Sequence, residues 1–258
     1  MDSALDTIVL LGAGVLAGLV GTAGAITSLI SYPALLATGV APLAASVANI
    51  VALTTSWPGS ALASRPELAG RGRWLARHAP LAALGGAIGT ALLLCTSPAA
   101  FERIVPFLVA AGSVTLLLAP RLTARRARRA SRSRHAPTRE PPWAATGIVA
   151  VSIYNGYFGA GAGVMLLALC LVYADESLPA ANALKNMLVG AATIAAAIGL
   201  VAFGHVDWGA VVPLGIGVFA GSTLGPAVTR RISADVLRPL VAAVGIGLAV
   251  QLWVTHGA

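Results

Sequence analysis

Long apolar runs separated by short polar segments are the dominant pattern along this chain. In the first half they cover residues 7–38, 42–63, 74–95 and 98–119, and in the second half 143–174, 178–203, 208–229 and 236–254. Such runs are long enough for membrane helices, which need roughly 20 residues to cross a bilayer. Because the runs are continuous instead of alternating, they predict helices and not the strands of a barrel. We expect an all-α membrane protein, a polytopic bundle of about eight transmembrane helices.

The first run of each half is too long for one straight helix and is rich in glycine. Residues 7–38 contain Gly21 within a glycine cluster and then Pro33, and the run 143–174 contains the sequence NGYFGAGAG. Irregular backbone at membrane depth is tolerated where it is buried in protein or lines a wet cavity. We therefore predict that both first helices are broken, in the first half near residues 21–25.

The two halves of the chain resemble each other. Residues 42–49 align without a gap with residues 179–186, and the glycine pattern that begins at Gly18 matches the one at Gly156, one residue out of step. Repeated halves are typical of secondary transporters, whose binding site lies near broken helices at the repeat interface. Four spans in each half would make the repeats parallel, and a different count of the broken runs would change that orientation.

Composition agrees with insertion into a membrane. Of the 258 residues, 57% are hydrophobic and 10% are charged, whereas a soluble domain carries about 25% charged residues. The formal net charge of +8 would suggest nucleic acid in a soluble protein. Here the basic residues are concentrated in connecting segments, as membrane topology requires, so we expect lipid and no nucleic acid around the protein.

An Arg-rich segment, residues 121–142, separates a first transmembrane repeat (1–120) from a second (143–258). It has eight arginines and no apolar run, so we interpret it as a flexible or weakly helical cytoplasmic loop. Counting spans from this loop places both termini in the cytoplasm of a multi-pass inner-membrane protein. In that count the pair Arg230-Arg231 falls outside, against the positive-inside rule.

The only lysine of the chain, Lys185, lies inside an apolar run together with Asn182 and Asn186. The three residues have helical spacing i, i+3 and i+4, so they share one face. An ammonium group and two amides supply donors that an oxyanion accepts. Charge in hydrocarbon is costly and marks functional sites, although a lysine that extends to the headgroups is the alternative. We favour a binding site for a small anion.

Further candidates come from the repeat and from the glycines. Asn49 and Ser46 occupy the corresponding region of the first half, although both residue types also hold membrane helices together. The glycines either permit close packing or open the helix so that backbone N–H groups face an anion, and their density favours the second interpretation. These glycine candidates are Gly21, Gly156, Gly159, Gly161 and Gly163.

The glycine cluster followed by Pro33, the segment 42–49 and the sequence NGYFGAGAG…LPAANALKN resemble the sulfite exporter TauE/SafE family of membrane permeases. The resemblance covers nearly the full length. It implies an inner-membrane transporter of small anions such as sulfite, thiosulfate or organosulfonates, with no cofactor. Ala48 stands where the second half has Lys185. The site is therefore expected to be asymmetric, with its charge from the second half.

The sequence contains no H-E-x-x-H motif, nucleophile elbow or clustered metal ligands, so we expect neither an enzyme nor a metal site. Two alternatives remain. One is a non-transporting scaffold that recruits lipids or partners through the Arg-rich loop. The other is a permease for another small solute, and the lack of intramembrane acidic or histidine clusters counts against a cation or metal. Substrate, direction of transport, coupling ion and oligomeric state stay open.

Overall fold

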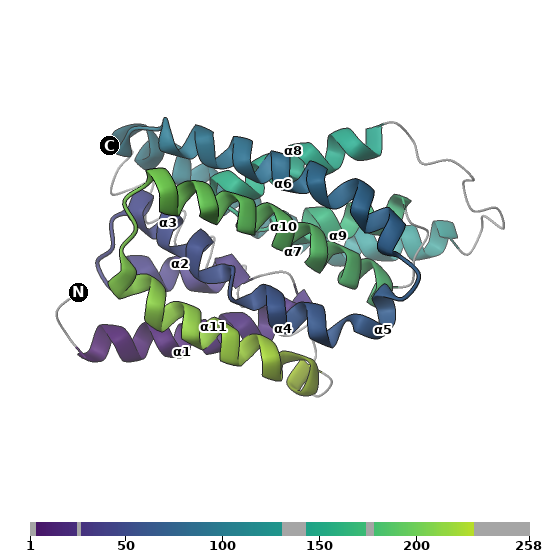
Figure 1. Ribbon diagram of the computed structural model, residues 1–258, viewed down its shortest axis with the longest axis horizontal. Helices are drawn as coiled ribbons and strands as arrows, with labels where there is room; N and C mark the ends of the chain where they lie inside the picture. Colours follow the sequence, from purple (N-terminus) through teal and green to yellow (C-terminus); the bar gives the residue numbers. More distant parts are fainter. Residues whose placement is uncertain (1–3, 25–26, 131–142, 174–177, 230–258) are drawn as a thin grey trace.

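The computed structural model describes residues 4–24, 27–130, 143–173 and 178–229, and within these ranges the chain is helical with no strand. In chain order the helices are α1 (Ala4–Gly24), α2 (Thr27–Ala37), α3 (Pro42–Leu53), α4 (Ser56–Ala63), α5 (Arg65–Leu68), α6 (Gly72–Leu94), α7 (Pro98–Ala130), α8 (Trp143–Tyr157), α9 (Ala162–Tyr173), α10 (Leu178–Phe203) and α11 (Trp208–Thr229). Figure 1 shows one elongated bundle whose helices lie along its length. Helix α3 is central, with residues 45–52 all buried.

The first helix of the first half is broken, as the glycines predicted. Helix α1 ends at Gly24, and α2 begins at Thr27 and packs back against α1. The approach is close at Gly21, where a Cβ atom would lie 1.7 Å from Thr27 Oγ1. Helix α2 has 11 residues, which is about half the length that a bilayer crossing needs.

The corresponding break in the second half lies between α8, which ends at Tyr157, and α9, which begins at Ala162. Gly159 and Gly161 in this connection have φ of +85° and +83°, a conformation that glycine adopts without steric cost. Helix α9 has 12 residues and packs against α8. Each broken run therefore forms a long helix followed by a short helix that turns back beside it.

Glycines bring the backbones of α1 and α11 into direct contact. A Cβ atom on Gly14 would lie 2.4 Å from the carbonyl oxygen of Leu214, and one on Gly18 would lie 2.4 Å from that of Val218. Because the contacts advance together along both helices, α1 and α11 run parallel. Close approach through small residues is a common way for membrane helices to associate.

Helices α6 and α8 make the same kind of contact. A Cβ atom on Gly85 would lie 2.7 Å from the Val149 carbonyl oxygen, and one on Gly89 would lie 2.1 Å from that of Ile153. These contacts also advance together, so α6 and α8 run parallel. In both pairs, the first helix of one half (α1 or α8) packs against the helix formed by the third apolar run of the other half (α11 or α6).

The remaining long helices join these two pairs. Gly86 of α6 lies against Ala192 of α10, which runs parallel to α6 and α8, and the turn after Phe203 then reverses the chain into α11. Gly59 of α4 lies against Ser222 of α11, and the two run parallel. Helices α1, α4 and α11 therefore run in one direction and α6, α8 and α10 in the opposite direction (Figure 1).

Two elements differ from the expected spans. The run 42–63 is interrupted between α3 and α4, where the hydroxyls of Thr54 and Ser56 bond to backbone carbonyls three residues earlier; such bonds compete with regular helix. Helix α7 continues to Ala130, so the start of the Arg-rich segment is helical, because alanine and arginine are strong helix formers. Residues 131–142 and the expected span 236–254 lie outside the described residues.

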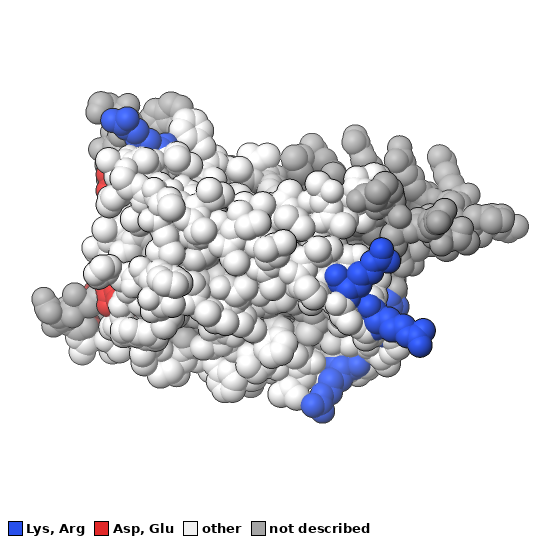
Figure 2. All heavy atoms as spheres, turned by 45° about the horizontal axis from the view of Figure 1, so that its top comes forward, with Lys and Arg blue, Asp and Glu red and all other residues white. Residues whose placement is uncertain are grey.

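The surface between the two ends of the bundle is apolar. Ile8, Ile198 and Phe203 are 67%, 66% and 81% exposed, and Figure 2 shows charged side chains only near the ends of the visible face. In the described part of the chain, Ala4–Gly21 and Pro179–Phe203 are long and apolar enough to cross a membrane, and α2, α9 and α11 contain shorter apolar segments. This surface is suited to lipid.

Candidate functional site

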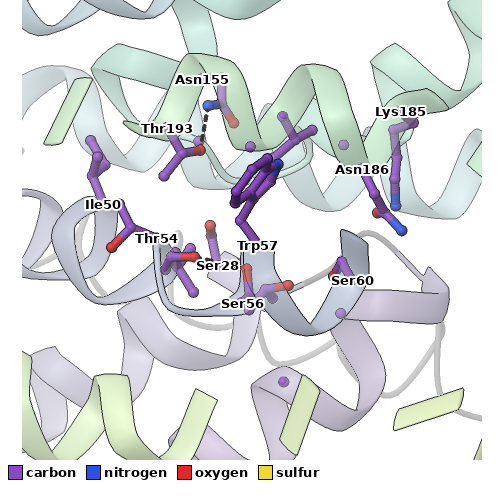
Figure 3. A pocket seen from close by; sticks show the side chains of 18 residues that line it. Ser28, Ile50, Thr54, Ser56, Trp57, Ser60, Asn155, Lys185, Asn186 and Thr193 are labelled. Atoms are coloured by element: carbon purple, nitrogen blue, oxygen red, sulfur yellow. Dashed lines mark hydrogen bonds between the residues drawn. The ribbon is translucent and has the colours of Figure 1, made fainter. Parts of the chain in front are cut away.

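A cavity of about 70 Å³ lies in the interior, where the two broken runs meet α3, α4 and α10. Figure 3 shows two walls. One wall comes from α8 and α10 and carries Asn155, Lys185, Asn186 and Thr193; the other comes from α2, the α3–α4 connection and α4, and carries Ser28, Thr54, Ser56, Trp57 and Ser60. Side chains from both halves of the chain thus enclose one polar space.

Among the described residues that line this cavity, Lys185 is the only one with a formal charge. Its side chain is 2% exposed and is one of the largest fully buried side chains of the described residues. It projects from α10 into the cavity beside Asn186 (Figure 3). No described acidic residue lines the cavity to neutralise it. A buried charge needs an opposite charge or strong hydrogen bonds, so an anion in the cavity would offset the cost of burying this amine.

Both short helices begin at the cavity. Thr27 and Ser28, in the first turn of α2, line it, and so does Gly163, in the first turn of α9. The N-terminus of a helix carries the positive end of its dipole and backbone N–H groups without intrahelical partners. Two helix N-termini and one ammonium group therefore converge on the same space, which is a favourable arrangement for an anion.

A hydrogen bond orders the α8–α10 wall. Asn155 is 5% exposed, and its Nδ2 atom donates to Thr193 Oγ1 at 3.0 Å. The Thr193 hydroxyl accepts in this bond, so its own proton is available to a ligand. Gly190, between Asn186 and Thr193, lies against the Trp57 ring, and a Cβ atom there would be 1.7 Å from Trp57 Cδ1. The indole therefore fills the groove beside the polar wall.

The structure brings half of the residues proposed from the sequence to this cavity. Its lining includes Lys185, Asn186, Gly21, Gly159 and Gly163. The lining does not include Asn182, although it is on the same helix, because the cavity continues from Asn186 toward Thr193 and not toward the start of α10.

The other four have structural contacts elsewhere. Asn49 Oδ1 accepts a hydrogen bond from Ser31 of α2. Ser46 Oγ donates to the Tyr157 carbonyl oxygen at 3.4 Å. Gly156 and Gly161 permit close contacts of α8 with α6 and of the α8–α9 connection with α7; a Cβ atom on either would lie less than 3 Å from the backbone of Gly86 or Gly112, respectively.

Several lining residues were not proposed from the sequence. Thr193 lies seven residues after Asn186 on α10, and this helical spacing could have identified it. The hydroxyls of Thr54, Ser56 and Ser60 belong to a polar stretch inside an apolar run, which gives a weaker signal because serine and threonine are common in membrane helices. Nothing in the linear pattern indicates that α4 faces α10.

Comparison with known proteins identifies the family. The family model for the sulfite exporter TauE/SafE matches residues 7–252, nearly the whole chain. No curated protein and no solved structure matches the chain. A transporter family agrees with the expectation that the chain is not an enzyme. Because the match extends over both halves and over every helix around the cavity, the chain belongs to the sulfite exporter TauE/SafE family, a family of membrane transporters.

Proposed function

We propose that the protein is a secondary transporter that binds a small sulfur-containing anion, such as sulfite, thiosulfate or an organosulfonate, in the cavity beside Lys185. The observation that carries this proposal is the buried Lys185 amine in a cavity at which the short helices α2 and α9 both begin. Family membership supports transport of a sulfur anion. The donors around the cavity suit sulfur oxyanions, whose oxygens are hydrogen-bond acceptors.

The size of the cavity supports a small ligand. Its volume is about 70 Å³, and one water molecule needs about 10–15 Å³ measured in this way. The space therefore accommodates a few waters or one compact oxyanion, and it is too small for a nucleotide or a large organic anion. We propose Lys185 and Asn186 as its direct donors, together with the backbone N–H group of Gly163 in the first turn of α9.

We further propose that the two halves are inverted repeats. The helix directions support this: α1 runs opposite to α8, α4 opposite to α10, and α6 opposite to α11. The reason is that each broken run turns back on itself. A run that was counted as one span thus contains two helices of opposite direction, and each half then has an odd number of segments. Inverted halves around a central site suit alternating access.

The same arrangement leads us to propose an orientation opposite to that expected for the N-terminus. The bundle end that holds the starts of α5 and α6 has Arg65, Arg71, Arg73 and Arg77 against Glu67, and α7 ends there with five further arginines in residues 121–129. The other end, where α1, α7 and α11 begin, has one described arginine, Arg103, and three carboxylates: Asp6, Glu102 and Asp207. The positive-inside rule then places the arginine end in the cytoplasm and Ala4 outside.

Thiol labelling in intact cells tests this orientation. Cys95 is exposed and caps the C-terminal end of α6, which lies at the end of the bundle where α1 begins. Ala4 and Ala69 are exposed at opposite ends. A membrane-impermeant maleimide should label Cys95 and, in a Cys95→Ser background, Ala4→Cys, whereas Ala69→Cys should react only after lysis. Labelling of Ala4→Cys only after lysis would instead support a cytoplasmic N-terminus and contradict the proposed orientation. Labelling of Ala4→Cys and Ala69→Cys from the same side would contradict the inverted arrangement.

Thermal unfolding of the purified protein with a panel of anions tests the binding function. Sulfite, thiosulfate and methanesulfonate should each raise the unfolding temperature, because a ligand at about 100 times its Kd stabilises the folded state by about 2.7 kcal/mol. Chloride at the same ionic strength is the control. If none of the sulfur anions stabilises the protein or crosses proteoliposome membranes that contain it, the proposed function is wrong.

A further inference from the structure

The two walls of the cavity differ in the hydrogen bonds that they offer. On the α8–α10 wall, Lys185 carries three N–H donors and the Thr193 hydroxyl retains its proton, because its oxygen accepts from Asn155 at 3.0 Å. Asn186 adds an amide on the same side (Figure 3). This wall therefore suits the oxygen atoms of an anion.

The opposite wall offers acceptors. The Thr54 hydroxyl donates its proton to the Val51 carbonyl oxygen at 2.7 Å, and the Ser56 hydroxyl donates its proton to that of Leu53, also at 2.7 Å. Each hydroxyl has one proton, so both oxygens can only accept from a ligand while these bonds persist. Rotation toward a ligand acceptor would break a short hydrogen bond in a water-poor interior, which is unfavourable.

A ligand that has only acceptor atoms matches one wall and not the other. Near Lys185 its oxygens would bond to the amine and to Asn186, but an oxygen on the far side would face the lone pairs of Ser56. Farther along the cavity, Thr193 and Thr54 show the same contrast between a donor and an acceptor. Ser28 and Ser60 also line the cavity and can serve either kind of ligand atom, because their hydroxyls both donate and accept. They do not remove the mismatch at Thr54 and Ser56.

We propose that the cavity selects sulfur oxyanions that carry a hydrogen-bond donor opposite their anionic oxygens, such as hydrogen sulfite or an amino- or hydroxy-substituted sulfonate. The inference rests on the proposed function and specifies the substrate class of the same site. The anionic oxygens face Lys185 and Asn186, and the O–H or N–H group of the ligand donates to Ser56 on the opposite wall. An oxyanion without such a donor binds more weakly, because the acceptor wall then stays unsatisfied.

Sulfamate and methanesulfonate form a matched pair of probes. Both are monoanions of nearly the same shape, and they differ in an NH₂ group against a CH₃ group on sulfur. Titration of the purified protein should show that sulfamate binds about tenfold more tightly, the effect of about one satisfied hydrogen bond. In the variant Ser56→Ala, and in the double variant that also carries Thr54→Val, the ratio of the two Kd values should fall toward one, mainly through weaker sulfamate binding.

Thr55→Val is the matched control. The Thr55 hydroxyl bonds to the carbonyl oxygens of Ala52 and Gly215, and the residue does not line the cavity, so this variant should keep the preference for sulfamate. Equal affinity of the unaltered protein for both probes would overturn the inference and leave the proposed anion site intact. Failure of sulfamate, methanesulfonate, sulfite and thiosulfate alike to bind would overturn both. Retention of the preference in both cavity variants would also reject the acceptor wall.

Discussion

Lys185→Met should abolish anion binding and transport while making the ligand-free protein more stable. The amine is 2% exposed, and no described carboxylate lines its cavity. Removal of one partner from a buried charge pair weakens binding by about 100-fold or more. In the absence of ligand, however, the buried ammonium is a cost to folding, and a methionine of similar length fills its place without that cost. Replacement of buried ionic groups by apolar ones stabilises proteins by about 1–4 kcal/mol in favourable cases.

Two measurements on the same preparation check this prediction. Anion flux into proteoliposomes should fall to background, and the unfolding temperature without ligand should rise. Arg73→Gln is the control, because it removes an exposed positive charge from the end of the bundle where α6 begins without altering the cavity. Its flux and stability should both stay close to those of the unaltered protein. Unchanged flux in Lys185→Met would remove the central residue of the proposed site.

Gly156→Ala should prevent stable assembly of α8 on α6. A Cβ atom on Gly156 would lie 2.2 Å from the Gly86 carbonyl oxygen. Backbone atoms cannot move aside as a side chain can, so the two helices must separate. Overpacking of a buried site costs about 1–3 kcal/mol and more where the structure cannot relax, and we expect a loss of about 2 kcal/mol or more in the free energy of unfolding.

Gly12→Ala is the matched control for this substitution. A Cβ atom on Gly12 would meet nothing within 4 Å, so its stability should be unchanged or slightly higher. Comparison of unfolding temperatures and of folded yield after gel filtration in detergent tests the pair. A stable Gly156→Ala protein that has lost only anion affinity would support a direct role of Gly156 in the site and argue against the packing role.

The sequence by itself determined the helical class of the protein, most of its helix positions and its central charge. The apolar runs predicted the bounds of α10 and α11, because membrane-length helices need continuous apolar residues whatever surrounds them. The glycine clusters predicted both helix breaks for a similarly local reason. A single lysine in such a run was recognisable because charge is rare and costly there.

Only the tertiary structure decided how these elements are arranged. Glycine permits both close packing and an open helix, so sequence alone did not separate Gly159, which lines the cavity, from Gly156, which lies against α6. The backward turns at the breaks depend on contacts of α2 with α1 and of α9 with α8. Each turn makes two helices of opposite direction out of a run that the sequence alone suggested was one span. Thr54, Ser56 and Thr193 became partners in one cavity because α4 and α10 pack together across the bundle, a contact between residues far apart in the chain.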